Sequence, residues 1–582
     1  MDNSFTYEAD NAGLSGQSGG YASQGVRSIT SAAAPEAASD SGIKAASGSG
    51  IEASPSIRSG MASQSRSATE KRTFTAKEKA MAWLSILPGY LFCRTFWIWR
   101  KPLTGLIFTA CLFAFALIFF GRQKRKPRSW FYLISAVVLS CALFFSSSPL
   151  LLIFTFGYIC FAFLMFCQTG SETALERRAG QLYFFETVKA VFASPFKSIG
   201  SSAGAIGSDN GGRKLGKTLL IILAGLCIAV VPTLIVARLL SFDGNFTGIL
   251  DKIGSAFFDK MFSHIWSLIF GALIGMYIYG ALYTSAHPVP DSFNEEKCID
   301  AENKMKFAPP LAGAVAIAPL LFLYVIFIAA QWDYYRAIFE SSLPEAYTFA
   351  EFARDGFFRL CLVAAVNAAV LAALRIFSRK TGKGRISPVV KVYTVILSLV
   401  TIVISCTAIS QMIMYVSQYG LTRLRLYTLW FMGLLVIMFF IAILKQFVEK
   451  LPFAATALAV FVVCFGILAV PDSDAYIARH NYNCYISGKT QELDTEYLGK
   501  LAPSSVPVLC DIVQNEEIPE NIRKSALAQL GEYAANSGSS VNLPGMLADK
   551  AYNELDNDTR AEAEKEKGKV AQKETQNNRR NS

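Results

Sequence analysis

The sequence predicts an all-α membrane protein: a polytopic transmembrane helix bundle of about eleven spans with a small extracytoplasmic C-terminal helical domain. Three observations predict this fold class. Of the 582 residues, 52% are hydrophobic and 13% aromatic, which is too apolar for a water-soluble protein of ordinary composition. Long apolar runs recur along the chain, and tryptophans and basic residues gather at the ends of these runs.

Each apolar run is about long enough to cross a ~30 Å hydrocarbon core as a helix. The eleven runs cover residues 83–99, 103–120, 130–145, 150–167, 219–240, 265–283, 308–330, 357–377, 392–416, 426–444 and 453–470. The runs 83–99 and 130–145 are the weakest, because the first contains Pro88 and Arg94 and the other is short. An interfacial or re-entrant segment in place of either run would reverse the orientation of the chain after it.

Tryptophans and basic residues predict the orientation. All seven tryptophans lie within about one helical turn of a run end, where the amphipathic ring prefers the headgroup region. The segments 71–79, 122–128, 177–217 and 375–385 are rich in Lys and Arg, which predicts a cytoplasmic side. The uncharged loop 146–149 and the acidic loop 332–355 then face outward. A cytoplasmic N-terminus and eleven spans place the C-terminus outside the cell membrane.

The composition divides the chain into four parts. Residues 1–78 are rich in Ser, Ala and Gly, which predicts a disordered cytoplasmic tail because such a segment cannot bury enough apolar surface. Residues 79–470 form the transmembrane domain, and within it the helical periodicity of 182–192 predicts an interfacial helix. Residues 471–552 form the extracytoplasmic helical domain, with capping residues such as Asp472. Residues 553–582 are predicted to be a second disordered tail.

No motif predicts a catalytic residue, a cofactor or a metal. The string GGRKLGKT at 211–218 matches the phosphate-binding loop pattern, but that loop follows a strand, whereas Ser/Gly-rich coil precedes it here. The three histidines do not have metal-ligand spacing. The net charge of +11 follows from the basic cytoplasmic loops, so it does not predict a nucleic-acid partner.

Two polar residues near the middle of spans are candidate membrane-depth contacts. Asn367 and Gln411 are interpreted as interhelical hydrogen-bonding residues, with the alternative that they line a path for a substrate. The spans contain no Asp or Glu, which argues against proton-coupled transport because such transport commonly uses a buried carboxylate. Cys484 and Cys510 both belong to the outward domain, where an oxidising environment permits a disulfide between them.

A cluster of charged residues is expected at the outer rim. Arg423 and Arg425 lie in the short outward turn YGLTRLR, against the usual charge bias, and therefore need partners. The candidate cluster consists of Glu351, Arg354, Asp355, Arg359, Arg423, Arg425 and Tyr427. One interpretation is a set of ion pairs that locks the spans together, and the other is a binding site for a ligand or a lipid headgroup.

Three segments resemble a known family. They are YTFAEFARDGFFRL (347–360), YGLTRLRLYTLWFM (419–432) and DAYIARHNYNCYISGKTQELDTEYLGKL (474–501), the last followed by VPVL (506–509). Together they resemble the bacterial membrane family catalogued as domain of unknown function 4173, which is related to 4153. The resemblance covers roughly residues 79–513 and excludes both tails. It implies a bacterial multi-span membrane protein and no particular activity.

These observations lead to two functional hypotheses. The first is a non-enzymatic membrane protein whose outward domain and rim cluster bind an envelope protein or a small ligand, in sensing or assembly. The alternative is a transporter or lipid-handling protein. In both cases the lipid bilayer is a partner.

Overall fold

Almost every described residue lies in a helix or in a short connection between helices. The computed structural model describes residues 73–97, 102–121, 123, 125–171, 174–175, 180, 182–208, 232, 236, 259–288, 295–332, 349–379, 386–536, 542–563 and 565. In these ranges no strand occurs, and the single β-type contact is an isolated bridge between Ala308 and Ser378. The predicted all-α class is therefore confirmed for the described part of the chain.

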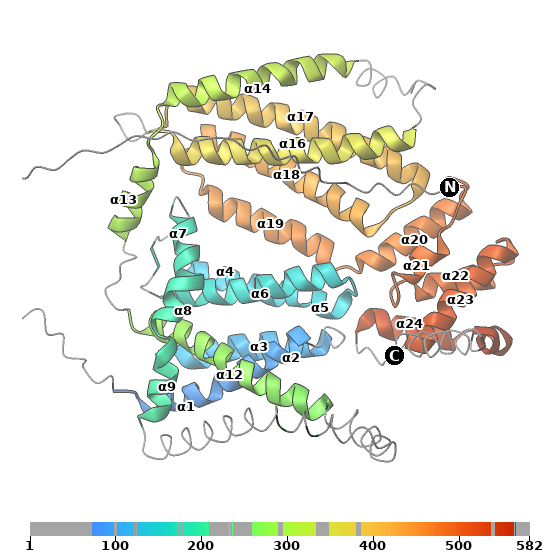
Figure 1. Cartoon of the computed structure of the whole chain (residues 1–582), viewed down its shortest axis with the longest axis horizontal. Coiled ribbons are helices and arrows are strands. Elements are labelled where there is room, and N and C mark those ends of the chain that lie inside the picture. Colours follow the sequence, from blue (N-terminus) through green and yellow to red (C-terminus); the bar gives the residue numbers. More distant parts are fainter. Residues whose placement is uncertain are drawn as a thin grey trace, which may run out of the picture. The chain divides into compact units, whose positions relative to one another are not determined.

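Eight helices pack around a shared core that we call the first bundle (Figure 1). They are α1 (Ala76–Leu84), α2 (Ile86–Trp97), α3 (Pro102–Phe120), α4 (Pro127–Ser140), α5 (Ala142–Phe145), α6 (Pro149–Thr169), α12 (Asp259–Ala286) and α19 (Phe453–Ala469). Aromatic rings such as Phe108, Phe163 and Phe166 are fully buried in this core. Helix α19 lies far along the sequence, yet it contributes Val462 and Phe465 to the same core.

The first apolar run is divided between two helices. Helix α1 ends at Leu84 and α2 begins at Ile86, so the run 83–99 is not one continuous helix. Pro88 accounts for the break, because it has no N–H to donate to the carbonyl of Leu84 and its ring displaces that carbonyl. With 9 and 12 residues, neither helix alone has the length of a span.

Helices α2 and α12 approach each other through glycines. A Cβ atom on Gly89 would overlap the backbone carbonyl of Gly271. A Cβ on Gly275 would lie 2.5 Å from the carbonyl oxygen of Ser85. The two backbones are therefore in direct contact, as in other membrane helix pairs with small residues at the crossing.

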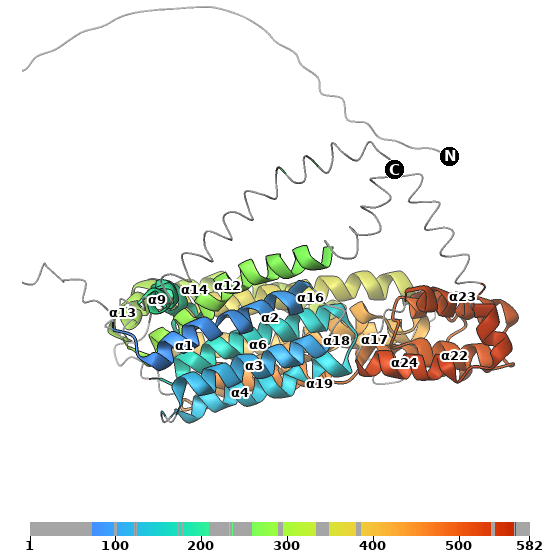
Figure 2. The same cartoon turned by 90° about the horizontal axis from the view of Figure 1, so that it is seen from below.

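A connector of four short helical segments follows α6. It comprises α7 (Tyr183–Val188), the π-helical turn η1 (Lys189–Ala193), α8 (Ser194–Lys197) and α9 (Ile199–Gly207). Figure 1 shows α7–α9 running across the ends of α6 and α12 rather than along them, and Figure 2 shows α9 at the same end of α12. The Ser194 hydroxyl donates to Gln168 Oε1 of α6 at 2.9 Å, and the Thr284 hydroxyl of α12 donates to the Ser194 carbonyl at 2.7 Å. These bonds hold the connector against both helix ends.

Four long helices form the second bundle. They are α14 (Pro310–Ala330), α16 (Phe349–Phe377), α17 (Pro388–Tyr419) and α18 (Arg423–Phe447), preceded by the polar helix α13 (Glu295–Met305). Their core includes Ile317, Phe357 and Leu397. The indole N–H of Trp430 in α18 donates to the carbonyl of Cys464 in α19 at 2.8 Å, which joins the two bundles.

The remaining helices, which we call the C-terminal helices, have a core of their own. They are α20 (Ser473–Ile486), α21 (Thr495–Gly499), α22 (Val506–Gln514), α23 (Glu520–Asn536) and α24 (Leu543–Asn553). Leu498, Leu509 and Leu530 are fully buried between them. Leu421, from the turn between α17 and α18, belongs to the same core, so these helices pack directly on the second bundle.

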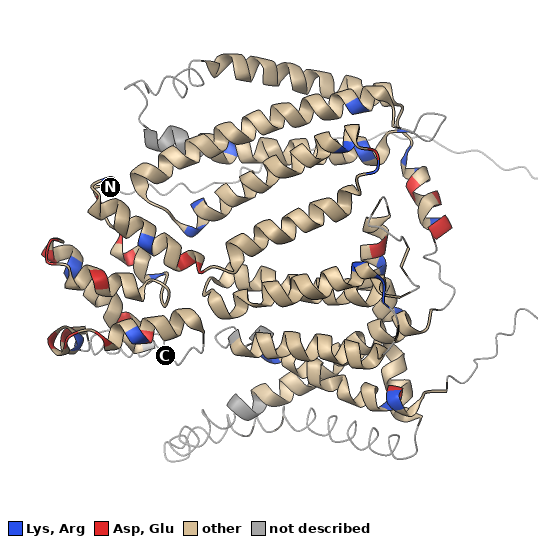
Figure 3. Ribbon diagram, turned by 180° about the vertical axis from the view of Figure 1, so that it is seen from behind, with Lys and Arg blue, Asp and Glu red and all other residues tan. Residues whose placement is uncertain are grey.

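Eight described helical stretches are long and apolar enough to cross a membrane, which makes this a membrane protein by helix length and composition. They are Leu103–Phe120, Pro127–Phe145, Pro149–Thr169, Ser263–Ala286, Pro310–Ala330, Gly356–Phe377, Pro388–Tyr419 and Arg423–Phe447. Helices α19 and α20, bent by 57°, make a ninth if they count as one span. Figure 3 shows charged residues mainly at the ends of the long helices and on the C-terminal helices.

The predicted count of eleven is only partly matched by these helices. The run 130–145 is long enough when it begins at Pro127, whereas the run 83–99 is split at Ser85. Of the run 219–240 only residues 232 and 236 are described, and the string 211–218 lies outside the described residues. The count of eleven therefore stays a prediction.

Candidate functional site

The turn between α17 and α18 carries the predicted rim arginines to the C-terminal helices. Gly420 has a φ of +72°, a conformation that favours glycine. The side chain of Asn481 in α20 brackets the turn, accepting from the Leu421 N–H at 2.6 Å and donating to the Leu421 carbonyl at 2.9 Å. Thr422 then caps α18 by accepting a bond from the Arg425 N–H. Arg423 is thereby held next to the first turn of α20.

Arg423 forms a two-pronged ion pair with Asp474. Its Nε donates to Asp474 Oδ1 at 2.8 Å and its Nη2 donates to Oδ2 at 2.7 Å. The Asp474 side chain is completely buried and that of Arg423 is 30% exposed. A paired, two-pronged guanidinium–carboxylate contact of this kind is stronger and more directional than a single hydrogen bond. The partner of Arg423 is thus an aspartate of α20.

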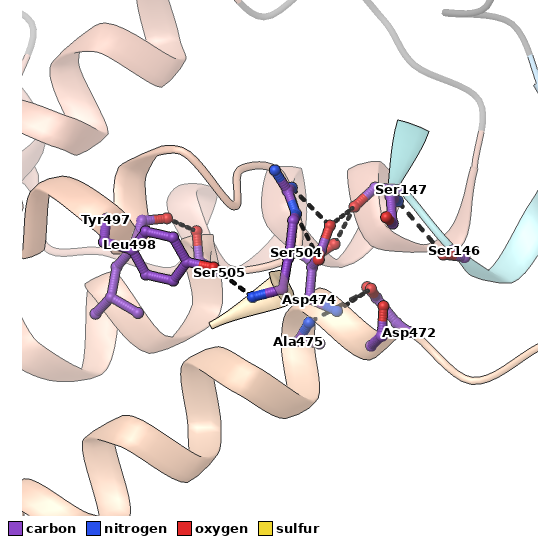
Figure 4. Close-up of polar contacts among 12 residues, drawn as sticks. Ser146, Ser147, Asp472, Asp474, Ala475, Tyr497, Leu498, Ser504 and Ser505 are labelled. Atoms are coloured by element: carbon purple, nitrogen blue, oxygen red, sulfur yellow. Dashed lines mark hydrogen bonds and ion pairs between the residues drawn. The ribbon is translucent and has the colours of Figure 1, made fainter. Parts of the chain in front are cut away.

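Hydroxyl groups of neighbouring residues surround the ion pair and complete the site. We call this site the polar junction, and it consists of Ser147, Ser148, Arg423, Tyr427, Asp472, Ser473, Asp474, Tyr497 and Ser504. Figure 4 shows Ser147 and Ser504 in contact beside Asp474, to which Ser147 donates at 3.5 Å. The Tyr427 hydroxyl lies 2.5 Å from Ser148 Oγ. The loop between α5 and α6, the start of α18 and the start of α20 therefore meet at one buried polar site.

Asp472 adds a second carboxyl group to the polar junction. Its side chain caps α20 by accepting from the N–H groups of Asp474 and Ala475. The pKa of the Asp472 carboxyl is raised from 3.8 to about 6, mainly because the group is buried. The charge of Asp474 also raises this pKa, whereas a hydrogen bond with Ser504 lowers it.

The raised pKa of Asp472 predicts a pH-dependent stability. Between about pH 4 and pH 6 the folded protein binds more protons at this carboxyl than the unfolded chain does, so the free energy of unfolding should fall as the pH rises through that window, by up to about 3 kcal/mol. Asp472→Asn keeps a capping side chain but cannot titrate, so its unfolding midpoint should change less with pH. Equal slopes for wild type and variant between pH 4 and pH 6 would contradict this prediction.

Arg425 forms hydrogen bonds within the turn between α17 and α18. Its Nη1 donates to the carbonyls of Tyr419, at 2.8 Å, and of Gly420, and its guanidinium lies 4.4 Å from the ring centre of Tyr415. Basic side chains commonly satisfy the last carbonyls of a helix in this way. Arg425 therefore caps the end of α17, while Tyr427 joins the polar junction.

The other predicted rim residues are not brought to this junction by any described contact. Glu351, Arg354 and Asp355 belong to α16, but their side chains lie outside the described residues. Arg359 is described and exposed on the same helix. The predicted ion pairing between the α16 residues and the rim arginines therefore stays a prediction, since Arg423 and Arg425 have the partners given above.

Asn367, which is predicted to lie at membrane depth, connects three helices of the second bundle. Its Oδ1 accepts from the Tyr324 hydroxyl of α14 at 2.6 Å, and its Nδ2 donates to Thr401 of α17 at 2.9 Å. Thr401 in turn donates to the Leu397 carbonyl at 2.6 Å. All these groups are buried. Asn367 therefore joins α14, α16 and α17 by hydrogen bonds.

Replacing Asn367 by Leu should therefore destabilise the second bundle. The change leaves the Tyr324 hydroxyl without its acceptor, and we expect a loss of about 1 to 2 kcal/mol, seen as a lower Tm in detergent. Val366→Leu is the matched control, because Val366 is exposed on the adjacent position. An unchanged Tm for Asn367→Leu would show that this hydrogen-bond chain contributes nothing.

Gln411 has a different environment. It is 3% exposed, and among the described residues its Oε1 has no hydrogen-bond partner. It faces Gly356 of α16, where a Cβ would lie 3.2 Å from this oxygen. The two mid-membrane residues are thus separate: one is part of a bonded chain and the other presents an unpaired amide oxygen.

The two cysteines of the C-terminal helices are both free thiols. Cys510 is buried in the core, which raises the pKa of its thiol to about 12. Cys484 lies one helical turn from His480, with Sγ 3.6 Å from Nε2. Within the described ranges, no three His, Cys, Asp or Glu side chains are grouped so that they could hold a metal ion.

Sequence reasoning missed the acidic half of the polar junction. The sequence pattern does not indicate Asp474, it indicates Asp472 only as a cap, and it marks the loop 146–149 only as uncharged. The available signal was the string PDSDAY, which places two carboxylates directly after the last apolar run, on the side where two arginines also lacked partners.

Comparisons with known proteins give a family but no activity. Neither a curated protein nor a solved structure matches the chain significantly. A family model described as "Domain of unknown function (DUF4153)" matches residues 133–512. That range includes most of both bundles, the rim turn and the polar junction up to α22. Since the match covers more than half of the chain, the protein belongs to the DUF4153 family.

Proposed function

We propose that the protein is a non-enzymatic membrane protein of a bacterial envelope, in which α20–α24 form an extracytoplasmic domain that binds an envelope protein or a small ligand, in sensing or assembly. The observation that carries the proposal is the ion pair between Arg423 and Asp474. A buried ion pair gives little net stability because both charges lose their hydration, and its best-attested use is to select one arrangement. A domain held in one position suits signalling between a bound partner and the spans.

The polar junction supports this coupling. Asp474 contacts α18 through Arg423 and the α5–α6 loop through Ser147. Tyr497 adds a further link by accepting from the Arg423 N–H at 2.7 Å. A partner that shifts α20 would therefore pull on helices of both bundles. By this proposal the predicted rim site serves as the attachment of the domain, and binding occurs on the domain surface.

Crosslinking in living cells would test this function. A photoreactive amino acid at Tyr476 or Ile486, which are 58% and 47% exposed on α20, should give a discrete protein or ligand adduct. The buried neighbour Ile477 is the control position and should give none. Adducts should diminish when Arg423→Ala releases the domain. The absence of any adduct from both exposed positions would overturn the proposal.

The proposed orientation has its own test. A membrane-impermeant thiol reagent should label Cys484 in intact cells, with buried Cys510 as the unreactive comparison. Labelling that requires permeabilised cells would put the C-terminal helices in the cytoplasm, together with the partner that they bind.

One observation favours the second candidate, a transporter or lipid-handling protein. The unpaired, buried Oε1 of Gln411 is a polar group of the kind that lines a substrate path. In Gln411→Cys, a small water-soluble thiol reagent should then react at position 411 in a bilayer, faster than at Cys361, a thiol partly buried in α16. Equal, slow reaction at both positions would support the packing role instead.

A further inference from the structure

The connector α7–η1–α8 has one buried and one apolar, exposed side. Its buried side includes Glu186, Ala190 and Ser194. Its exposed side presents Phe184, which is 69% exposed, and Phe192, which is 61% exposed. A third ring, at position 196, is 57% exposed. Three large rings exposed on one short segment need an apolar environment, because exposure to water would cost about 2 kcal/mol each.

The π-helical turn brings the three phenylalanines to one side. Phe184 and Phe192 are eight residues apart, and Phe184 and Phe196 twelve, neither of which is a whole number of α-helical turns. The turn η1 contains i→i+5 bonds, such as that from the Ser194 N–H to the Lys189 carbonyl, and so inserts about one extra residue. With this extra residue discounted, Phe192 and Phe196 follow Phe184 by about seven and eleven residues of regular α-helix. These separations are close to two and three full turns.

Contacts with the spans determine the depth of the connector in the membrane. Arg128, at the start of α4, forms a 2.6 Å ion pair with the fully buried Glu186 of α7. Two residues later Trp130 is 45% exposed, and Ile134 and Val138 continue the exposed apolar side of α4. Since a tryptophan at the end of a span marks the headgroup region, α7 lies at the level where the hydrocarbon core begins.

Bonds to one further helix, α12, hold the other end of the connector. Tyr277 of α12 donates its hydroxyl to the carbonyl of Val191 at 2.6 Å, and Thr284 of α12 donates to Ser194. Lys197, next to Phe196, is also exposed. The connector thus runs across span ends at the membrane boundary, with an apolar side and an adjacent cation.

We infer that α7, η1 and α8 form a lipid-binding surface that lies in one leaflet of the bilayer, with Phe184, Phe192 and Phe196 inserted among phospholipid acyl chains. The buried ion pair and the bonds to α6 and α12 then transmit the position of this leaflet to the first bundle. The sequence suggested an interfacial helix here, and the structure assigns its lipid-facing side and the π turn that creates it. The inference does not depend on the function proposed for the C-terminal helices.

Photocrosslinking of the full-length protein in phospholipid nanodiscs tests this surface. Benzoylphenylalanine at position 192 or 196 should form a phospholipid adduct, detected by mass, with a yield similar to that at Phe322, an exposed ring in the middle of α14. The same group in place of Phe163, which is buried in the first bundle, should give at least about tenfold less. Because Phe192 and Phe196 are exposed, these variants should retain the wild-type size-exclusion profile and Tm.

The alternative outcomes are distinct. Crosslinks from positions 192 and 196 to another part of this chain or to a second copy, without a lipid adduct, would overturn the inference and identify the aromatic side as a protein interface. A lipid adduct at position 192 that disappears when residue 190 is deleted, which converts the π turn to an α turn, would support the proposed role of η1. Persistence of equal adducts at all three phenylalanine positions after that deletion would overturn that role.

Discussion

Arg423→Ala should release the C-terminal helices from the bundles, with a loss of about 3 to 5 kcal/mol in the free energy of unfolding. The reason is the complete burial of Asp474, whose carboxylate would remain in the protein interior without its cation. Limited proteolysis in detergent should cut the segment around residue 472 faster than in wild type, and the Tm of the C-terminal helices should fall.

The reciprocal change, Asp474→Ala, should cost less than Arg423→Ala. Arg423 is 30% exposed and its long side chain can reach water, whereas Asp474 cannot. The double replacement by apolar residues of similar size, Arg423→Met with Asp474→Leu, should recover much of the loss because neither charge remains buried. A double variant as unstable as the sum of the singles would show that the ion pair itself has no special role.

An exposed ion pair of the same helix provides the control. Arg479 and Asp511 are bonded at 2.7 Å but are 50% and 42% exposed. Exposed pairs contribute about 0 to 1 kcal/mol, so Arg479→Ala should leave the Tm and the cleavage rate nearly unchanged. If Arg479→Ala were as damaging as Arg423→Ala, burial could not be the cause.

Gly89→Ala should be the most damaging single methyl addition in the first bundle. The new Cβ would overlap the backbone carbonyl of Gly271, and backbone cannot move aside as a side chain can. Helices α2 and α12 would have to separate, with a loss of about 3 kcal/mol or more despite the higher helix propensity of alanine. Thermal unfolding in detergent measures this loss.

Gly157→Ala on α6 is the matched control for the glycine contact. No atom lies within 4 Å of the position that its Cβ would occupy. The variant should keep the wild-type Tm or raise it slightly, because alanine favours the helix by about 1 kcal/mol. Similar Tm values for Gly89→Ala and Gly157→Ala would contradict a direct backbone contact between α2 and α12.

Much of the fold followed from local patterns. Apolar runs predicted the helices, since each residue that faces lipid must be apolar whatever its neighbours are. The helix break before Pro88 also has a local cause, the missing N–H of proline. The position of Arg423 and Arg425 indicated a site at the turn before α18, because arginines in a loop that is predicted to face outward contradict the general charge bias.

The identity of the partners did not follow from such patterns. Arg423 pairs with Asp474, fifty-one residues away on α20, and not with a residue of α16 by any described contact. Likewise α19 packs in the first bundle although α18, directly before it, belongs to the second. A periodic pattern shows which side of a helix is apolar. It does not show which other helix packs there, because any helix with an apolar side of similar shape could do so.

The sequence alone determined that this protein is a helical membrane protein, and that its rim arginines needed acceptors. The tertiary structure alone decided that Asp474 would be buried against Arg423, that Gly89 would touch Gly271, and that a π-helical turn would form at Lys189–Ala193. The reason is physical: hydrophobicity and backbone bonding act within about one turn of the chain, whereas close packing and buried charge pairing depend on groups that only folding brings together.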